Sequence, residues 1–333
     1  MLCSIVRYAG AALLCTIAAA IAAADTAAAG GAGFSLRDNP GQYLDILLDG
    51  RVVGRYMYAY DKSTRKRQAE TYKPYLHVFD AEGKAPITKG PGGQDTHHRG
   101  IYIGWQRVIF QGEKYNLWEM GDGAIVHQKF SLREAGPEQA TVVSLTHWND
   151  HADKPIIEEQ RTMTFHRAPA PFRLMINFTA ALTAPRGDVR LEADPEHGGV
   201  QYRPADMTEG LAKTETVFVL PKQHAKAHAD VDYPWAGETY TLRGKRYSIV
   251  DLNHPDNPKG TKFSAYRDYG RFGAYFKAEI ASGQSLTVKY RFLVAEGSMP
   301  EADVIQKCWD AFAGVKSPTP VPKTTVRKAD PWP

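Results

Sequence analysis

Two adjacent histidines and an arginine, His97, His98 and Arg99, stand directly before an apolar stretch of the chain. Imidazole side chains exchange protons near neutral pH and bind metal ions, and a guanidinium binds carboxylates. The preceding residues 92–96 are glycine-rich and polar, which places the histidines at a loop on the edge of a scaffold. The segment therefore predicts proton transfer, metal binding or anion binding.

Strand geometry helps to choose among these chemistries. If residues 97–105 are extended, successive side chains point to opposite faces. His98 then shares a face with Tyr102, whereas His97 lies on the other face with Trp105. Neighbouring histidines would point apart, so proton transfer is favoured over a metal site formed by the pair.

A carboxylate and an imidazole lie side by side at Glu196 and His197, followed by two glycines and then Arg203. Such a pair can divide the acid and base roles of proton transfer at neutral pH. Arg203 could bind a substrate carboxylate or form a structural bridge with Glu196. Taken alone, the segment is more typical of a solvated turn than of an active site.

A rigid turn is predicted at residues 254–258, because two prolines restrict the backbone of the sequence HPDNP. This turn would hold His254 and Asn257 at set angles. Arg267 and Asp268 follow on the next extended segment. These two residues could contact a ligand or pair with each other.

The first 24 residues have the pattern of a secretory signal peptide: one positive charge at Arg7, an apolar run over 9–21 and alanines at 22–24. We therefore predict a secreted or periplasmic protein. Cys308 is the one cysteine outside this segment, so no intramolecular disulfide is expected. A net charge of +4 without a Lys/Arg block gives no signature of nucleic-acid binding, and no later stretch approaches the roughly 18 apolar residues of a membrane span.

Alternation of apolar and polar residues dominates the chain, most clearly over 172–180 and 286–294. Shorter runs of the same kind cover 43–48, 141–148 and 214–220, and Gly, Pro, Asn or Asp clusters separate them. Many short alternating segments are typical of antiparallel strands. The fold class predicted is all-β, a large antiparallel β-sandwich.

One segment near the end of the chain departs from this pattern. Its apolar residues recur at helical spacing: Val304, Ile305, Cys308, Trp309 and Phe312. They predict one C-terminal helix docked on the sandwich, with a capping box formed by Ser298 and Glu301. Residues 25–313 are expected to form a single domain, and residues 314–333, rich in Pro, Lys and Thr, a flexible tail.

Several segments together resemble a bacterial family labelled PmoA, or methane oxygenase PmoA. They are KPYLHVFDAEGKAPITKG, DTHHRGIYIGW, EHGGVQYRP and HPDNP followed by YRDYG, and the resemblance spans about residues 40–312. Particulate methane oxygenase is an integral membrane copper enzyme, and its transmembrane helices have no counterpart after the predicted signal peptide. The resemblance instead implies the galactose mutarotase-like supersandwich and a place among exported carbohydrate-utilisation proteins.

On this resemblance we expect an enzyme that cleaves a glycosidic bond, by hydrolysis or elimination, in an acidic or modified sugar. The expected catalytic residues are His97, His98, Glu196 and His197. The expected substrate-binding residues are Arg99, Tyr102, Trp105, Trp118, Arg203, His254, Asn257, Arg267 and Asp268.

Three alternatives stay open: an aldose epimerase-like enzyme, a non-catalytic carbohydrate-binding protein, and a metal-dependent site with His97, His98 or His254 as ligands. The main prediction requires no metal and no cofactor.

Overall fold

The computed structural model of the protein describes residues 31–93, 95–194, 196–206, 215–227, 229–317 and 323–329. Strands account for 49% of the structure and helices for 7%, so the predicted all-β class is confirmed. The predicted signal peptide, residues 1–24, lies outside the described residues.

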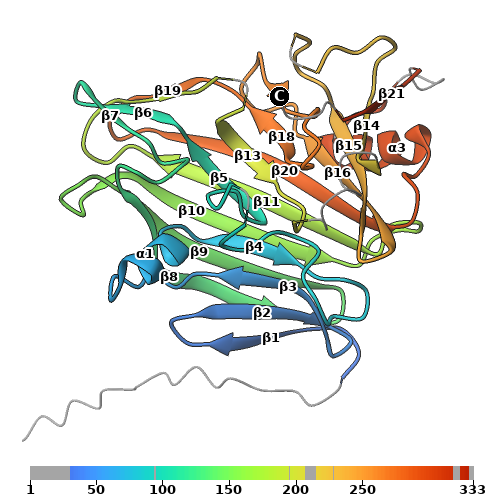
Figure 1. Ribbon diagram of the computed structural model, residues 1–333, viewed down its shortest axis with the longest axis horizontal. Helices are drawn as coiled ribbons and strands as arrows, with labels where there is room; N and C mark the ends of the chain where they lie inside the picture. The colour runs from blue at the N-terminus through green and yellow to red at the C-terminus, as the bar shows by residue number, and fades with distance from the viewer. Residues whose placement is uncertain are drawn as a thin grey trace, which may run out of the picture.

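Two large sheets and one small sheet make up the fold (Figure 1). The eight-stranded sheet contains, in spatial order, β1 (Phe34–Asn39), β2 (Tyr43–Leu48), β3 (Arg51–Met57), β4 (Tyr75–Val78), β5 (Ile101–Trp105), β13 (Gly198–Tyr202), β18 (Phe272–Tyr275) and β17 (Lys262–Phe263). The nine-stranded sheet contains β21 (Thr325–Lys328), β14 (Val217–Leu220), β15 (Trp235–Leu242), β16 (Lys245–Asn253), β20 (Ser285–Glu296), β11 (Leu174–Thr183), β10 (Pro155–His166), β9 (Gln139–Asn149) and β8 (Ala124–Ala135). The small sheet contains β19 (Ala278–Ile280), β12 (Val189–Glu192), β6 (Arg107–Phe110) and β7 (Glu113–Tyr115). Neighbouring strands pair antiparallel.

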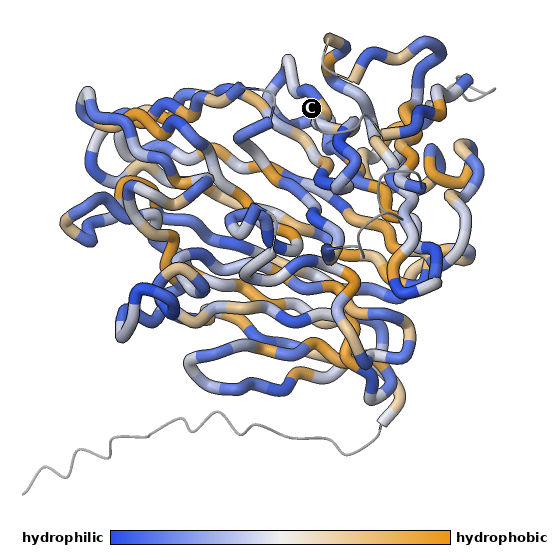
Figure 2. Tube along the Cα trace, viewed as in Figure 1, coloured by the Kyte–Doolittle hydropathy of each residue, from blue (hydrophilic) through white to orange (hydrophobic). Residues whose placement is uncertain are grey.

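Alternating side chains hold the two large sheets together as a sandwich. Every second residue of β11 is buried, and hydrophobic and hydrophilic residues alternate along the strands in Figure 2. Ile103 of one sheet and Phe178 of the other belong to the same buried cluster. A β-carbon at Gly54 in β3 would lie 2.8 Å from the Phe165 ring in β10, so the two sheets are in direct contact there. The predicted antiparallel sandwich is therefore confirmed.

The C-terminal helix α3 (Ala302–Ala313) packs its apolar face on the nine-stranded sheet, as predicted. Its N-cap is Glu301, which makes no capping hydrogen bond through its side chain, so the expected capping box at Ser298 is wrong. The expected flexible tail is also wrong at Thr325–Lys328, because these residues form the edge strand β21 and pair with β14.

Helix α1 (Arg65–Thr71) precedes β4 and begins at the N-cap Thr64, whose hydroxyl accepts a hydrogen bond from the backbone of Arg67. The strands β4, β5, β13 and β18 are consecutive neighbours in the eight-stranded sheet. They bring the segments that carry His97 and Glu196 close to Arg267, which pairs with Glu196, although these residues are far apart in the sequence.

Candidate functional site

Strand β5 has two chemically different faces. Ile101, Ile103 and Trp105 belong to the core between the sheets, whereas Tyr102 packs with Tyr75 and Trp118 in a separate cluster. Alternation along a strand places Tyr102 on the face turned away from the core. The candidate site lies on that outer face.

The two histidines lie in the loop that enters β5. Residues 95–97 form a turn, in which the backbone N–H of His98 donates to the Asp95 carbonyl at 2.8 Å, and the strand begins only at Ile101. The rings of His97 and His98 are 4.2 Å apart. The prediction that these neighbours point apart is therefore wrong. The predicted proximity of His98 to Tyr102 is confirmed, because their rings are 6.3 Å apart.

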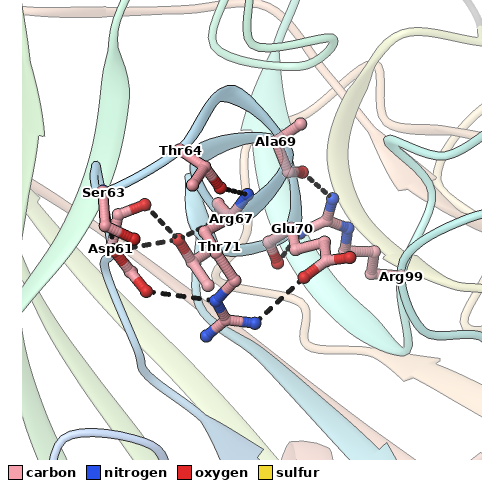
Figure 3. A network of polar contacts seen from close by, with 8 residues as sticks. All are labelled: Asp61, Ser63, Thr64, Arg67, Ala69, Glu70, Thr71 and Arg99. Carbon is pink, nitrogen blue, oxygen red and sulfur yellow. Dashed lines mark hydrogen bonds and ion pairs between the residues drawn. The ribbon is translucent and has the colours of Figure 1, made fainter.

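Hydrogen bonds from Arg99 connect this loop to the C-terminal end of α1 (Figure 3). Its guanidinium donates to the carbonyls of Glu70 at 2.7 Å, Ala69 at 2.5 Å and Thr96 at 3.1 Å. The last carbonyls of a helix have no partner inside the helix, and a cation there is favourable. Arg99 is fully buried and its donors bind backbone, so the expectation that it binds substrate is corrected: it positions the histidine loop.

The part of the site open to solvent, called here the accessible layer, consists of His97, Glu196, His197 and Arg267. The side chains of the last three are 20%, 28% and 16% exposed, and His97 is half-buried. Burial and neighbouring cations, Lys73 first among them, lower the pKa of His97 to about 3, so its imidazole is neutral at physiological pH.

Each remaining member of the accessible layer has a charged partner. The Nδ1 atom of His197 lies 2.6 Å from Oδ1 of Asp194, a hydrogen bond that orients the ring and directs Nε2 away from this contact. Glu196 accepts from Nη2 of Arg267 at 2.6 Å. Burial would raise the pKa of Glu196, but hydrogen bonds from Tyr266 and Arg267 outweigh it and lower the pKa, so the carboxylate is ionised.

Beneath the accessible layer lies a buried polar cluster, called here the recess: Lys73, His98, Tyr102, Trp118 and Arg271. Their side chains are close together, with ring centroids 5.0 Å apart for Tyr102 and Trp118 and 5.8 Å apart for His98 and Trp118. Nζ of Lys73 is 4.5 Å from the centre of the Tyr102 ring and donates to the Trp118 carbonyl at 2.8 Å. Tyr102 and Trp118 are fully buried, so they offer polar atoms rather than the stacking surfaces expected from the sequence.

Most polar atoms of the recess form no hydrogen bond within the described part of the chain. The atoms that form no hydrogen bond are both ring nitrogens of His98, of which Nδ1 lies 3.7 Å from Oδ2 of Asp95, the hydroxyl of Tyr102, Nε1 of Trp118 and Nε of Arg271. Burial, reinforced by Arg99, lowers the pKa of Lys73 well below its usual value. Burial and the charge of Arg271 similarly lower the pKa of His98, which is therefore neutral.

Arginines flank and connect the two layers. Nη1 of Arg271 donates to Gln201 at 3.0 Å, and Nη2 lies 3.9 Å from Glu196 in the accessible layer. Arg203 is fully buried and donates to the carbonyl of Tyr269 and to Asp206 at 3.0 Å. The alternative of a bridge between Arg203 and Glu196 is wrong, because Glu196 pairs with Arg267 and Arg271.

Three predicted substrate-binding residues have structural roles elsewhere. Nε1 of the fully buried Trp105 donates to the Phe276 carbonyl at 3.0 Å in the core, so Trp105 presents no face to a sugar. Asn257 bonds through its amide to Asn253 and to the backbone of Lys289, which fixes the predicted turn.

His254 packs against Phe312 of α3, with ring centroids 5.0 Å apart, and does not join the other histidines. Asp268 is buried, and its carbonyl accepts from Thr216. Substrate binding by Asp268 therefore stays a prediction. The expectation that Trp105, His254 and Asn257 bind substrate is corrected.

The structure also adds Lys73, Asp194 and Arg271, which sequence reasoning missed. Lys73 is the first residue of the KPYLHV segment, and Arg271 comes directly after YRDYG. Both therefore lie within or beside the sequence segments that carry the family resemblance. Nothing in the sequence distinguished Asp194 from the other acidic residues, because its role depends on the turn that brings it to His197.

Comparison with protein families adds a broader context. The sequence model of a family of unknown function, DUF6807, matches residues 43–310, most of the chain. The chain belongs to the DUF6807 family. This match does not confirm the PmoA label that the motifs suggested. No curated protein matches the DUF6807 chain in sequence.

Solved structures resemble the DUF6807 chain at low identity. A heparan sulfate lyase from Pedobacter heparinus is 8% identical, with a TM-score of 0.42 over 80% of this chain and 37% of its own. A β-arabinopyranosidase is 9% identical, with a TM-score of 0.39 over 73% of this chain and 39% of its own. A galactose 1-epimerase from Lactobacillus acidophilus is 9% identical, with a TM-score of 0.27 over 79% of this chain and 94% of its own. The chain spans about two-fifths of the length of the first two proteins.

Among the described residues there is no group of three or more His, Cys, Asp or Glu side chains that could hold a metal ion. Within the same part of the chain, no helix is long and apolar enough to span a membrane.

Proposed function

We propose that the protein cleaves glycosidic bonds of an acidic sugar by elimination, with His197 as the proton-transfer residue. The observation that carries this proposal is the 2.6 Å hydrogen bond between His197 and Asp194 in the accessible layer, next to the cationic recess. A carboxylate that fixes one ring nitrogen leaves the other oriented for proton transfer. His97, whose pKa is about 3, is neutral and suited to hydrogen bonding with the substrate rather than to carrying a proton.

Hydrolysis by two carboxylates is less compatible with this geometry. That reaction uses two Asp or Glu side chains that face the bond, one as acid and one as base or nucleophile. In the accessible layer, Glu196 is ion-paired with Arg267, and Asp194 is bonded to His197. Both carboxylates are thus engaged, whereas elimination requires one base and a site that stabilises negative charge.

The proposed reaction uses the acidity of the carbon beside a sugar carboxylate. His197 takes the proton from this carbon, and the electron pair passes through an enolate-like state into a new carbon–carbon double bond. The bond from the neighbouring carbon to the leaving sugar oxygen breaks, and the proton on His197 passes to that oxygen. The Arg271 guanidinium, together with Lys73 in the protonated form that a bound anion favours, stabilises the negative charge which develops on the carboxylate.

The protein would act outside the cytoplasm. This part of the proposal rests on the predicted signal peptide at residues 1–24. Polysaccharides with acidic sugars are then the substrates to examine first.

Activity assays on a polysaccharide panel test the proposal. We expect cleavage of uronate-containing chains, detected as new reducing ends, and none of neutral chains. His197→Asn should lower kcat by roughly 10²- to 10⁴-fold, the usual contribution of general acid–base catalysis. The matched control is His151→Gln, at an exposed histidine in the β9–β10 connection. Full activity of His197→Asn would contradict the assignment, and anomer exchange without cleavage would indicate an epimerase instead.

A further inference from the structure

The recess gathers buried hydrogen-bond donors on the outer face of β5. Trp118 and Arg271 can only donate through their side-chain nitrogens, and Nζ of Lys73 has, in either protonation state, at least one N–H group beyond the one that bonds to the Trp118 carbonyl. The Tyr102 hydroxyl and the neutral His98 ring can each donate one hydrogen bond. All five side chains are at least nine-tenths buried.

The side chains of the recess that can become positively charged are Lys73, His98 and Arg271, and no member of the recess is a carboxylate. Lys73 and Arg271 are at most 1% exposed, and Arg99 and Arg203 lie close enough to lower the pKa values of their neighbours. No described carboxylate forms an ion pair with Lys73. The distance between Oε2 of Glu196 and Nη2 of Arg271 is 3.9 Å, longer than a hydrogen bond. Buried donors without partners are costly, and the carboxylate beside the buried Arg271 guanidinium, Glu196, is also paired with Arg267, so a ligand that satisfies these groups must be an acceptor and an anion.

We propose that the recess binds the anionic oxo group, carboxylate or sulfate, of the sugar that the accessible layer holds. This inference rests on the proposed function and names the part of the substrate that enters the protein. Trp118 Nε1, Tyr102 and Lys73 donate to the oxygens of the anion, and Arg271 connects it to Glu196. The sugar ring itself remains above, at His97 and His197.

The two layers then have separate tasks. The recess discriminates acidic from neutral sugars, since a neutral hydroxymethyl group leaves the cations unpaired. The accessible layer places the carbon beside the acid group next to His197. Binding an anion also favours the protonated forms of Lys73, which Arg99, Glu119 and His97 face, and of His98, which Arg271, Arg203, His97 and Asp95 face.

Binding measurements on the full chain test this inference, with glucuronate, inorganic sulfate and neutral glucose as probes. Titration calorimetry should show glucuronate or sulfate binding with proton uptake, and no comparable binding of glucose. Lys73→Met and Trp118→Phe should each weaken anion binding by roughly 10- to 100-fold, because each removes a donor to a charged group. Lys62→Met, at an exposed lysine paired with Asp153, is the matched control and should bind as the wild type does. Trp118→Phe retains an aromatic ring, so it serves as the readout if Lys73→Met does not fold.

The outcomes separate the recess from the proposed reaction. Equal anion affinity in the wild type, Lys73→Met and Trp118→Phe would overturn the recess assignment, as would failure of the wild type to bind either anion. Weakened anion binding in both variants supports the recess even if no polysaccharide is cleaved, in which case the proposed reaction alone fails. Cleavage with an unchanged KM in both variants would leave the reaction standing and remove the recess.

Discussion

At the residue scale, three histidines near one another have different environments. His98 is buried and forms no hydrogen bond through its ring with the described residues, and His97 is half-buried and neutral. His197 alone of the three forms a hydrogen bond with a carboxylate, at Asp194. The sequence names all three histidines as candidates, but it does not reveal their partners, because no sequence pattern distinguishes Asp194 from other acidic residues.

Asp194→Asn tests this distinction. An amide can still contact the His197 ring, but it no longer fixes one tautomer or stabilises the imidazolium that forms during proton transfer. We expect kcat to fall by roughly 10²- to 10⁴-fold with little change in KM. Steady-state kinetics provide the measurement, with Asp153→Asn at an exposed ion pair as the control. A variant with wild-type kcat would show that Asp194 does not assist His197.

At the element scale, the sequence predicts the strands and the C-terminal helix well, because burial alternates with the period of each element. The prediction failed where the backbone leaves the extended region. Asp95 has φ of 50° and Gly100 has φ of 44°, and these left-handed residues turn the chain on either side of the histidines. A pattern of side-chain types does not reveal such turns in a segment otherwise compatible with a strand.

Arg99 connects two elements, and its replacement tests that connection. Arg99→Met removes three hydrogen bonds to carbonyls and leaves the end of α1 without partners. We expect a loss of roughly 2–4 kcal/mol in the free energy of unfolding, measured by urea denaturation. Arg67→Met, at a more exposed ion pair on α1, should lower the free energy of unfolding by clearly less than Arg99→Met does. Equal losses in both variants would contradict the positioning role.

Gly104 allows the segment that carries Trp118 to cross β5. A β-carbon at this position would lie 2.5 Å from the carbonyl oxygen of Leu117. Gly104→Ala should therefore displace Trp118, lower stability by roughly 1–3 kcal/mol and weaken anion binding. Gly121→Ala, where a β-carbon meets nothing within 4 Å, should leave both properties near wild type. Calorimetric melting and anion titration of the two variants provide the measurements. A Gly104→Ala variant with wild-type stability and anion affinity would contradict the role assigned to Gly104.

At the scale of the whole molecule, the site is assembled by sheet order. Strands β4, β5, β13 and β18 come from distant parts of the chain yet lie side by side, and this order places Lys73, His98, His197 and Arg271 together. The sequence predicted a composite site from three segments, but it could not supply strand order, since alternation says only which face a residue occupies. His254 shows the consequence: its motif looked equally suitable, but its ring packs against Phe312 of α3 instead.

Global stability should depend on pH through buried neutral histidines. Burial lowers the pKa of His77 to about 4, well below its value in the unfolded chain. Below an unfolded pKa of about 6.5 the unfolded state takes up a proton that the folded state does not, so stability falls as pH drops toward 4 and is constant above that window. His77 contributes roughly 3 kcal/mol to this loss. Urea denaturation at acidic and at neutral pH gives the change in the free energy of unfolding between the two pH values. This change should be smaller for His77→Gln than for the wild type, and an equal change in both proteins would contradict a contribution from His77.

The most direct test of the account is the mass of the product formed from a uronate-containing polysaccharide. Elimination at the acidic sugar predicts an unsaturated chain end that is one water lighter than the hydrolysis product and carries no oxygen from labelled water. Its formation should require His197. Uptake of labelled oxygen at the cleaved bond, or cleavage confined to neutral sugars, would contradict the account.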